Sequence, residues 1–410
     1  MPDDALARPA AGPATDFART RALFDLPPGL AYLDGNSLGP LPRAARERVR
    51  RALDDEWGAM LIGGWNKAGW MAQPRALGER IGRLIGAAPG HTVVGDTLSI
   101  KVFQALAASL ALRPDRRVIL SDTGNFPSDL YVAEGLITAL GRGHQLRLAD
   151  PEALEEAITE EVAVLLVTEV DYRTGRRHDV AALTAKAHDM GALAVWDLAH
   201  SAGALPVDVA GGAADFAVGC TYKYLNGGPG APGFIAVHPS HAADAPAALS
   251  GWLGHRAPFD FDLSYAPGEG IERFRVGTPP VLQMAALDAA LDAWEGVSLD
   301  DVRARSLLLA DRLIEGALAA CPDLVLATPR EPARRGSQVS FRHPEGYAAM
   351  QALIARGVVG DFRAPDIMRF GITPLFVGEA EVDRAVEVLA EVMGRRLWDD
   401  PAYRARASVT

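Results

Sequence analysis

The sequence predicts an α/β fold, in which a large domain with a mostly parallel, seven-stranded type of sheet is joined to a smaller α+β C-terminal domain. Between about residues 100 and 237, helical segments alternate with short apolar strands, the pattern of a parallel sheet covered by helices. From about residue 300 this rhythm changes. The 410 residues also exceed what one small core holds, so two domains are expected.

The N-terminal part is expected to pack with the small domain. Residues 1 to about 16 are rich in Ala and Pro and are expected to be mobile. Residues 32–40 predict a short strand that enters a Gly/Asn turn, and a helix is expected over 42–57, with a proline near its first turn. We therefore expect an N-terminal segment (1–55), a large cofactor-binding domain (56–295) and a small domain (296–410).

The elements of the two domains follow from apolar runs and helical periodicity. In the large domain we expect helices over 101–112, from 127–130 to about 140, over 151–158 and over 180–190, and strands at 118–120, 146–148, 162–167, 192–196, 216–218 and 234–237. In the small domain we expect helices over 302–320, 347–356 and 379–398, and strands near 324–326, 339–341, 358–359 and 368–370.

Composition excludes several classes of protein. The net charge of −11 argues against a nucleic-acid partner, which would favour a basic domain. Two cysteines make neither a disulfide framework nor a zinc cluster, and no metal site is expected. No run approaches 18 apolar residues, and the first residues lack the apolar core of a signal peptide, so we expect a cytoplasmic protein without a membrane partner.

Candidate functional residues follow the predicted strands, because ligands of parallel α/β sheets bind beyond the carboxyl ends of the strands. Asp197 follows the strand 192–196, and Lys223 lies five residues beyond the strand 216–218. A lysine there can form a Schiff base with an aldehyde cofactor, and an aspartate can keep a pyridine nitrogen protonated. On spacing alone, an ordinary ion pair explains the two residues as well.

Asp197 and Lys223 lie in the segments DLAHSAG at 197–203 and CTYKYLNGGPG at 220–230. These two segments resemble the core motifs of kynureninase, a family of pyridoxal-phosphate enzymes with the aspartate-aminotransferase fold, known as fold type I. Further matches follow in chain order, so the resemblance spans roughly residues 30 to 375: LDGNSLG at 33–39, NFPSD at 125–129, YRTG at 172–175, GWLGH at 251–255 and MRFG at 368–371.

The resemblance implies the roles of individual residues. Lys223 would form the Schiff base, Asp197 would pair with the pyridine nitrogen, and Tyr222 would add a donor to the phosphate. The reaction also needs an acid that protonates the product, and our hypothesis is that Tyr222 is this third catalytic residue. Phe126 would stack on the cofactor ring, and Arg369 would fork onto the substrate α-carboxylate. The implied cofactor-binding residues are Leu98, Ser99, Phe126, Asp129, Thr168, Asp197, His200, Tyr222, Lys223, Trp252 and Thr278, and the implied substrate-binding residues are Arg369, Asn36, Ser37 and Trp65.

Each of these residues also has an ordinary structural interpretation. Phe126 and Trp252 are explained by core packing, His200 by a satisfied structural histidine, and Arg369 by one of many surface arginines. Cys220, beside the predicted site, is better explained as a small core residue than as a nucleophile. A G-x-G-x-x-G match at 228–233 is rejected as a dinucleotide fingerprint, because it contains two prolines and leads into a strand rather than a helix.

The activity that the resemblance implies is hydrolysis of L-kynurenine to anthranilate and L-alanine, through an external aldimine of pyridoxal 5'-phosphate and Cβ–Cγ cleavage, in tryptophan catabolism and NAD biosynthesis. It also implies a homodimer, with Thr278 and Trp65 reaching the partner's site. At these two positions the animal members, which favour the 3-hydroxylated substrate, resemble each other in carrying Asn and His. The departure of this chain from that pattern implies a preference for plain kynurenine. A cysteine desulfurase, an aminotransferase or epimerase of the same fold, and an inactive scaffold stay as alternatives.

Overall fold

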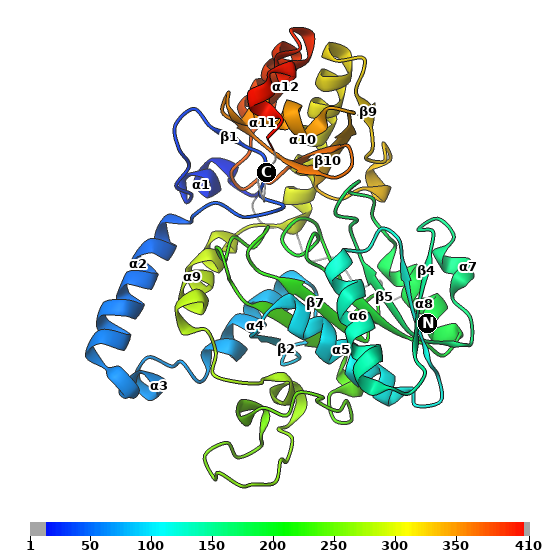
Figure 1. Ribbon diagram of the computed structural model, residues 1–410. Helices are drawn as coiled ribbons and strands as arrows, with labels where there is room; N and C mark the ends of the chain where they lie inside the picture. The colour runs from blue at the N-terminus through cyan, green and yellow to red at the C-terminus, as the bar shows by residue number, and fades with distance from the viewer. Residues whose placement is uncertain (1–13, 406–410) are drawn as a thin grey trace, which may run out of the picture.

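A seven-stranded sheet forms the centre of the larger part of the molecule in the computed structural model, which describes residues 14–405 (Figure 1). The strand order is β2-β8-β7-β6-β5-β3-β4, and β8 alone runs against its neighbours. Its strands are β2 (Thr92–Val94), β3 (Val118–Asp122), β4 (Gln145–Ala149), β5 (Val162–Thr168), β6 (Leu193–Asp197), β7 (Phe216–Cys220) and β8 (Gly233–Val237). The predicted fold class, an α/β protein with a mostly parallel sheet of seven strands and a small C-terminal domain, is confirmed.

Helices cover both faces of this sheet. Along β5, Val164 and Leu166 pack with α5 and α6, whereas Leu165 and Val167 pack on the opposite face with α4, α8 and α9. This alternation follows from the two-residue period of a strand and explains why the strand is apolar throughout. These helices are α4 (Gln73–Leu84), α5 (Leu98–Leu112), α6 (Pro127–Leu140), α8 (Val180–Asp189) and α9 (Val281–Leu291). The short α7 (Leu154–Ala157) contacts β3, and the short α3 (Gly64–Lys67) packs on the segment 52–63 that precedes it.

The C-terminal part contains an antiparallel sheet with the order β12-β13-β10-β9. Helices α10 and α12 pack against each other beside it (Figure 1). The elements are α10 (Leu299–Ala320), β9 (Val325–Leu326), β10 (Gln338–Arg342), α11 (Gly346–Ile354), β11 (Val358–Val359), β12 (Asp361–Arg363), β13 (Ile367–Gly371) and α12 (Glu379–Gly394).

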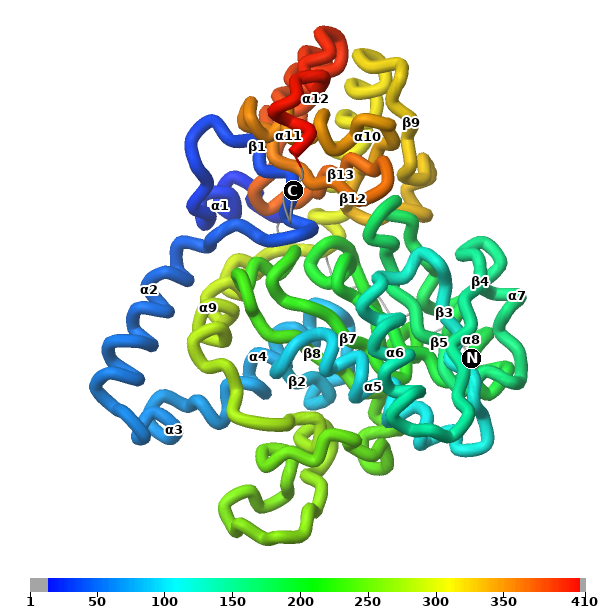
Figure 2. The backbone as a smooth tube through the Cα atoms, viewed as in Figure 1, coloured from blue at the N-terminus to red at the C-terminus, as the bar shows by residue number. Residues whose placement is uncertain are grey.

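The N-terminal segment runs beside this C-terminal part before it reaches the large sheet (Figure 2). After α1 (Phe17–Ala22), the strand β1 (Ala31–Tyr32) pairs in parallel with β11. The chain then enters α2 (Arg43–Arg51), which packs along α9. The predicted division into an N-terminal segment and two domains, with its boundaries, stays a prediction.

Several local predictions differ from the structure. The helix expected over 42–57 is an α-helix only to Arg51 and continues as a π-helix over Ala52–Ala59. The last helix ends at Gly394, before the predicted residue 398, and the helix expected over 151–158 is one turn, α7. The helices α1, α4 and α9 and the strands β2 and β12 were not predicted.

The expected mobility of the N-terminus is wrong for the part that the structure describes. Thr15 is buried, and its N–H donates to the Asp301 carboxylate at 2.7 Å. Asp16 caps α1 by accepting a hydrogen bond from the Arg19 N–H. The prediction for residues 1–13 lies outside the described residues. Within 14–405, no helix is both long and apolar enough to cross a membrane.

Candidate active site

The carboxyl ends of β5 and β6 bring two of the predicted residues together. Thr168 and Asp197 are register partners at this edge, and Asp197 also pairs with Val218 of β7. The Asp197 Oδ1 accepts a hydrogen bond from the Ala199 N–H at 2.8 Å, which fixes the carboxylate at the sheet edge. Burial raises the pKa of Asp197 to about 6, although Lys223 lowers it.

Lys223 lies on the loop after β7, and its Nζ is 2.9 Å from Nε2 of His200. Burial and the neighbouring Lys223 hold the pKa of His200 well below its usual value, so this imidazole is neutral at pH 7. The His200 Nδ1 has no hydrogen-bond partner among the described residues. The neutral ring thus holds the lysine amine without repelling it.

Asp129 is a second buried carboxyl group beside Lys223. It lies in the first turn of α6, and its Oδ2 has no hydrogen-bond partner in the described part of the chain. Burial and the nearby Asp197 raise the pKa of Asp129 well above its ordinary value, while Lys223 lowers it. An unpaired buried carboxyl oxygen is costly, so this oxygen is suited to a ligand.

Aromatic side chains flank the amine of Lys223. Its Nζ lies 5.8 Å from the ring centroid of Phe126 and 5.9 Å from that of Tyr222. The Phe126 ring is 40% exposed and is held edge-on by Tyr172, with ring centroids 5.0 Å apart. An exposed, positioned ring beside an amine provides a flat surface on which a planar ligand can stack.

Leu98 and Ser99 open the 15-residue helix α5, whose N-cap residue Thr97 makes no side-chain capping bond. The first backbone N–H groups of a helix have no acceptor within the helix, and an anion satisfies them. The Ser99 hydroxyl lies 3.2 Å from that of Ser128, which adds donors at this end. Gly233 lets the chain pass close, because a Cβ there would lie 2.8 Å from the Leu98 nitrogen.

The N-terminal turn at 33–39 lies directly against the Lys223 loop. The Gly39 N–H donates to the Tyr222 carbonyl at 2.8 Å. A Cβ on Gly39 would lie 2.6 Å from the Lys223 carbonyl oxygen, so only glycine permits this approach. This contact places Ser37, which precedes Gly39 by two residues, next to the small domain's arginines.

Arg369 is buried, and its donors are almost all engaged within the protein. Its Nε donates to Asp361 Oδ1 at 2.7 Å, and its Nη2 forms a further, short hydrogen bond to Asp361 Oδ2. Nη2 also donates to the Ser37 hydroxyl at 2.7 Å, and Nη1 donates to the Tyr172 carbonyl at 2.6 Å. The bidentate face predicted for the substrate is therefore turned to Asp361 in this structure.

Asn36, Trp65, Trp252 and Thr278 make no hydrogen bond or ring contact with Lys223, Asp197 or His200 in the described part of the chain. Asn36 is fully buried against Gly371, with both amide atoms unpaired. Trp65 packs edge-on against Trp252, with ring centroids 6.3 Å apart. Thr278 is exposed on a separate loop. The roles predicted for these residues stay predictions.

Sequence reasoning missed Asp361 and Arg363, which surround Ser37 together with Arg369. Arg363 Nη2 lies 2.7 Å from Asp361 Oδ2 and donates to the Ser37 hydroxyl at 3.1 Å. The sequence carried one usable signal. Asp361 and Arg369 are eight residues apart and lie on two short strands, and the two residues become register partners if these strands form a hairpin.

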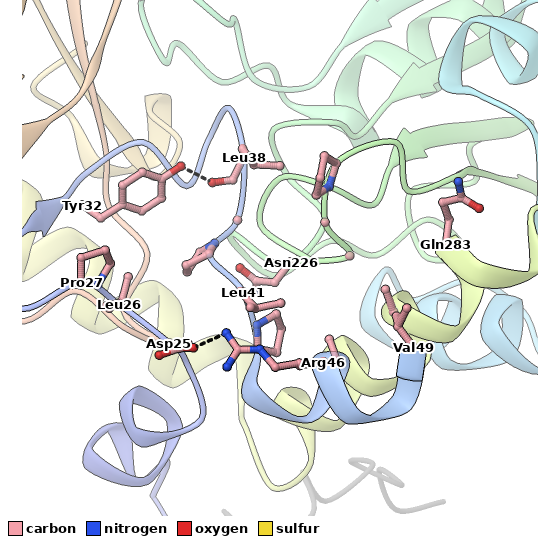
Figure 3. A pocket seen from close by; sticks show the side chains of 18 of the residues that line it. Asp25, Leu26, Pro27, Tyr32, Leu38, Leu41, Arg46, Val49, Asn226 and Gln283 are labelled. Carbon is pink, nitrogen blue, oxygen red and sulfur yellow. Dashed lines mark hydrogen bonds and ion pairs between the residues drawn. The ribbon is translucent and has the colours of Figure 1, made fainter. Parts of the chain in front are cut away.

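An apolar groove of about 700 Å³ lies beside this site but does not include Lys223, Asp197 or His200. Figure 3 shows Tyr32 and Leu38 on one side of it, Leu41 and Val49 near α2, and Gln283 on α9. Its lining also contains the turn 226–229 that follows Lys223. The groove is therefore a neighbour of the candidate site and does not hold its chemical groups.

Comparisons with known proteins agree with this geometry. The chain is 50% identical to the kynureninase of Pseudomonas fluorescens over 401 residues, which cover 96% of each protein. The chain belongs to the kynureninase family. The family described as "Kynureninase C-terminal domain" matches residues 302–389.

Solved structures outside the kynureninase family share the fold. The cysteine desulfurase CsdA of Escherichia coli superposes with a TM-score of 0.76 at 20% identity, covering 93% of this chain and 99% of that protein. A variant of the cystine lyase C-DES, whose structure holds glycine covalently linked to pyridoxal phosphate, gives a TM-score of 0.74 at 19% identity, covering 92% and 100% of the two chains. At these identities the likeness establishes the fold alone.

The two cysteines of this kynureninase-family chain do not provide an exposed nucleophile. Cys220 and Cys321 are both 3% exposed, and burial raises the pKa of each thiol. Cys321 ends α10, as expected for its place after the predicted helix. A thiol that attacks a substrate must be accessible and ionisable, so neither residue suits desulfurase chemistry.

Proposed function

We propose that this protein hydrolyses L-kynurenine to anthranilate and L-alanine with pyridoxal 5'-phosphate as its cofactor. The observation that carries the proposal is the grouping of Lys223, Asp197, Asp129 and Phe126 at the carboxyl edge of the sheet, in a chain of the kynureninase family. The place in tryptophan catabolism and NAD biosynthesis and a cytoplasmic location stay predictions.

The residues present fit pyridoxal phosphate at each end of that molecule. The uncapped N-terminus of α5, with the Ser99 hydroxyl, suits the phosphate. The Asp197 carboxylate suits a protonated pyridine nitrogen, and the exposed Phe126 ring suits the ring face. The Asp129 Oδ2, buried and unpaired, is ready for a further polar group of the ligand.

Lys223 is the best of the chain's four lysines for holding an aldehyde. Lys101 is fully buried, and its Nζ bonds to Asp96, Gln104 and the Phe274 carbonyl. These bonds use all three of its donors. The other two lysines, Lys67 and Lys186, lie on α3 and α8, outside the carboxyl edge of the sheet.

When bound, pyridoxal phosphate supplies an aldehyde for amines and an electron-withdrawing ring, which acidifies the substrate's α-hydrogen. In the proposed reaction, Lys223 Nζ removes the proton from the substrate Cα and returns a proton later, while neutral His200 keeps the amine oriented. Water adds to the γ-carbonyl carbon and the Cβ–Cγ bond breaks, which releases anthranilate. Asp197 keeps its negative charge at the sheet edge throughout.

Tyr222 is the proposed proton donor to the Cβ of the alanine product. The neighbouring Cys220 and burial raise the pKa of its phenol above the ordinary value, so the group keeps its proton at neutral pH. Arg369 and Ser37 are proposed to lie at the carboxylate end of the substrate, which their contacts with each other support.

We also propose that two copies associate. Apolar side chains are exposed on the segments 53–62 and 259–263, and the groove of Figure 3 adds an apolar surface. Solvent-exposed apolar surface of this kind favours association. Thr278 and Trp65 are proposed to act in the partner's site and to favour plain kynurenine over its 3-hydroxylated form. Light scattering on the purified protein should give about twice the 43.5 kDa chain mass, and a monomer would contradict the proposal.

The proposed activity is tested by mixing the purified protein, loaded with pyridoxal phosphate, with L-kynurenine or its 3-hydroxylated form. We expect anthranilate fluorescence to rise with L-kynurenine and kcat/KM to be higher for it than for the hydroxylated compound. Higher kcat/KM for the hydroxylated compound would overturn the assignment made from Trp65 and Thr278. Absence of anthranilate would overturn the activity itself.

A further inference from the structure

We propose that Arg363 shares the substrate's α-carboxylate with Arg369, and that Asp361 is the positioning residue that holds the two arginines side by side. The proposal rests on the proposed function for the identity of the substrate. It assigns the specificity for an α-carboxylate to a pair of guanidinium groups, of which sequence reasoning found only Arg369.

The sheet register creates the arrangement. β12 pairs with β13 in antiparallel fashion, and Asp361 is the register partner of Arg369. Arg363 follows Asp361 by two residues and therefore projects from the same face of β12. Ser37, from the N-terminal turn, completes the cluster by accepting hydrogen bonds from both arginines and donating one to Asp361 at 2.5 Å.

The two arginines differ in how many donors they have left. Four of the five N–H groups of Arg369 are engaged by Asp361, Ser37 and the Tyr172 carbonyl, and its side chain is 1% exposed. Arg363 bonds through Nη2 to Asp361 and Ser37 and through Nη1 to its own strand. These bonds use three of its five N–H groups, and its side chain is 33% exposed.

The cluster also carries unbalanced positive charge. Arg363 and Arg369 share the single carboxylate of Asp361, whose pKa is lowered by Arg369 despite its burial. The nearby Asp34 does not fully neutralise the charge of the second arginine, because burial and Asp361 raise the pKa of the Asp34 carboxyl group to about 7. Two partly desolvated cations on one anion favour a second anion at the same place.

The cluster lies close to the Lys223 loop, because the turn that carries Ser37 packs against that loop through Gly39. Arg369 and Arg363 both lower the pKa of His200, after the larger effects of burial and Lys223. His200 Nε2 contacts Lys223 Nζ, where the substrate's amino group is proposed to react. The positive charges of the two arginines therefore act close to this reacting nitrogen. An α-amino acid carries its carboxylate one carbon from that nitrogen, so Arg363 is suited to receive it.

The test compares two ligands that differ only in the carboxylate, using the protein loaded with pyridoxal phosphate. One ligand is L-kynurenine, and the other is the corresponding amine that lacks the carboxylate. The variants are Arg363→Lys, which keeps the positive charge but loses the bidentate guanidinium group, and Arg363→Gln, which loses both. The control is Arg342→Lys, an exposed arginine on β10 that pairs with Asp366.

We expect Arg363→Lys to raise the KM for L-kynurenine about tenfold or more, with kcat changed by less than about threefold, and to leave the dissociation constant of the amine unchanged. Arg342→Lys should change neither ligand's binding. Asp361→Glu should keep more of the carboxylate selectivity than Asp361→Asn. If both ligands weaken equally in the Arg363 variants, or if neither weakens, the proposal is overturned. If Arg363→Gln does not fold, Arg363→Lys decides.

This test is separate from that of the proposed function. If the wild-type protein releases no anthranilate, the proposed activity fails. The proposed carboxylate site is then tested with L-alanine and ethylamine, whose binding is followed by the absorbance of the cofactor. Selective loss of L-alanine binding in Arg363→Lys would support the site, and equal binding to wild type and variant would overturn it.

Discussion

The amine of Lys223 lies 2.9 Å from Nε2 of His200, and this imidazole is neutral because burial and the lysine lower its pKa. The contact orients a flexible lysine toward Asp197 and Phe126 without a competing charge. It follows from two loops, 198–203 and 221–226, which leave adjacent parallel strands at the same edge of the sheet.

The first prediction concerns the covalent attachment of the cofactor. Lys223→Ala should abolish the absorbance of the bound aldehyde and lower kcat by at least about a thousandfold, because the base and the attachment point are lost together. Borohydride reduction of the wild-type protein, followed by peptide mapping, should label Lys223. Lys186→Ala, on α8, is the control and should behave as wild type. A label on the buried Lys101 would contradict the assignment.

The second prediction concerns pH. The pKa of Asp197 is raised to about 6 in the protein without cofactor, so its carboxylate is present above that pH and is lost as the pH falls through it. Affinity for pyridoxal phosphate, measured by spectroscopic titration, should therefore fall below about pH 6. Asp197→Asn should bind weakly at every pH, with a flatter profile, whereas Asp189→Asn should keep the wild-type profile. An unchanged profile in Asp197→Asn would refute this role.

The third prediction concerns stacking. Phe126→Ala should weaken cofactor binding about tenfold, because a positioned aromatic face contributes on the order of 1 kcal/mol beyond its buried area. Phe126→Tyr should restore most of the affinity. Tyr131→Ala removes an exposed ring from the same helix, α6, and should have no effect. If Phe126→Ala binds as well as wild type, the ring does not stack on the cofactor.

The fourth prediction concerns the proton donor. Tyr222→Phe removes a phenol whose raised pKa keeps it protonated. We expect kcat to fall about 10- to 100-fold in steady-state kinetics, with a smaller change in KM, because the group acts on the departing product. Tyr131→Phe is the matched control. Unchanged turnover in Tyr222→Phe would assign the proton donor elsewhere.

The fifth prediction concerns stability. Because the pKa of Asp34 is raised to about 7, the native state binds this proton more tightly than the unfolded chain does. The contribution of Asp34 to the free energy of unfolding should therefore fall by about 2–4 kcal/mol as the pH rises from about 4 to about 7. Urea titrations of Asp34→Asn should lack this pH-dependent loss of unfolding free energy, whereas titrations of Asp115→Asn, at an exposed position, should still show it. A pH dependence of Asp34→Asn identical to that of the wild type would refute the prediction.

Much of the fold could be predicted because the central strands are buried on both faces and are apolar from end to end. The strand ends then placed Thr168, Asp197 and Lys223 at one edge. The sequence motifs added Phe126 and Asp129, which spacing alone does not connect to Lys223.

Other features depend on long-range contacts that local pattern does not encode. Asp361 gains its place from the pairing of two short strands, and its contact with Ser37 joins residues 324 positions apart. The π-helix at Ala52–Ala59 continues the expected helical periodicity with a different hydrogen-bond pattern. Helix α9 was missed because it is apolar on most sides and lacks a polar face that would mark it.

The most direct test of the account is the product balance of the wild-type protein with L-kynurenine and pyridoxal phosphate. Anthranilate is measured by fluorescence and L-alanine by amino-acid analysis. The account predicts equal amounts of the two products and none from Lys223→Ala. Transfer of the amino group to a 2-oxo acid without anthranilate, or release of sulfide from cysteine in place of this reaction, would contradict it.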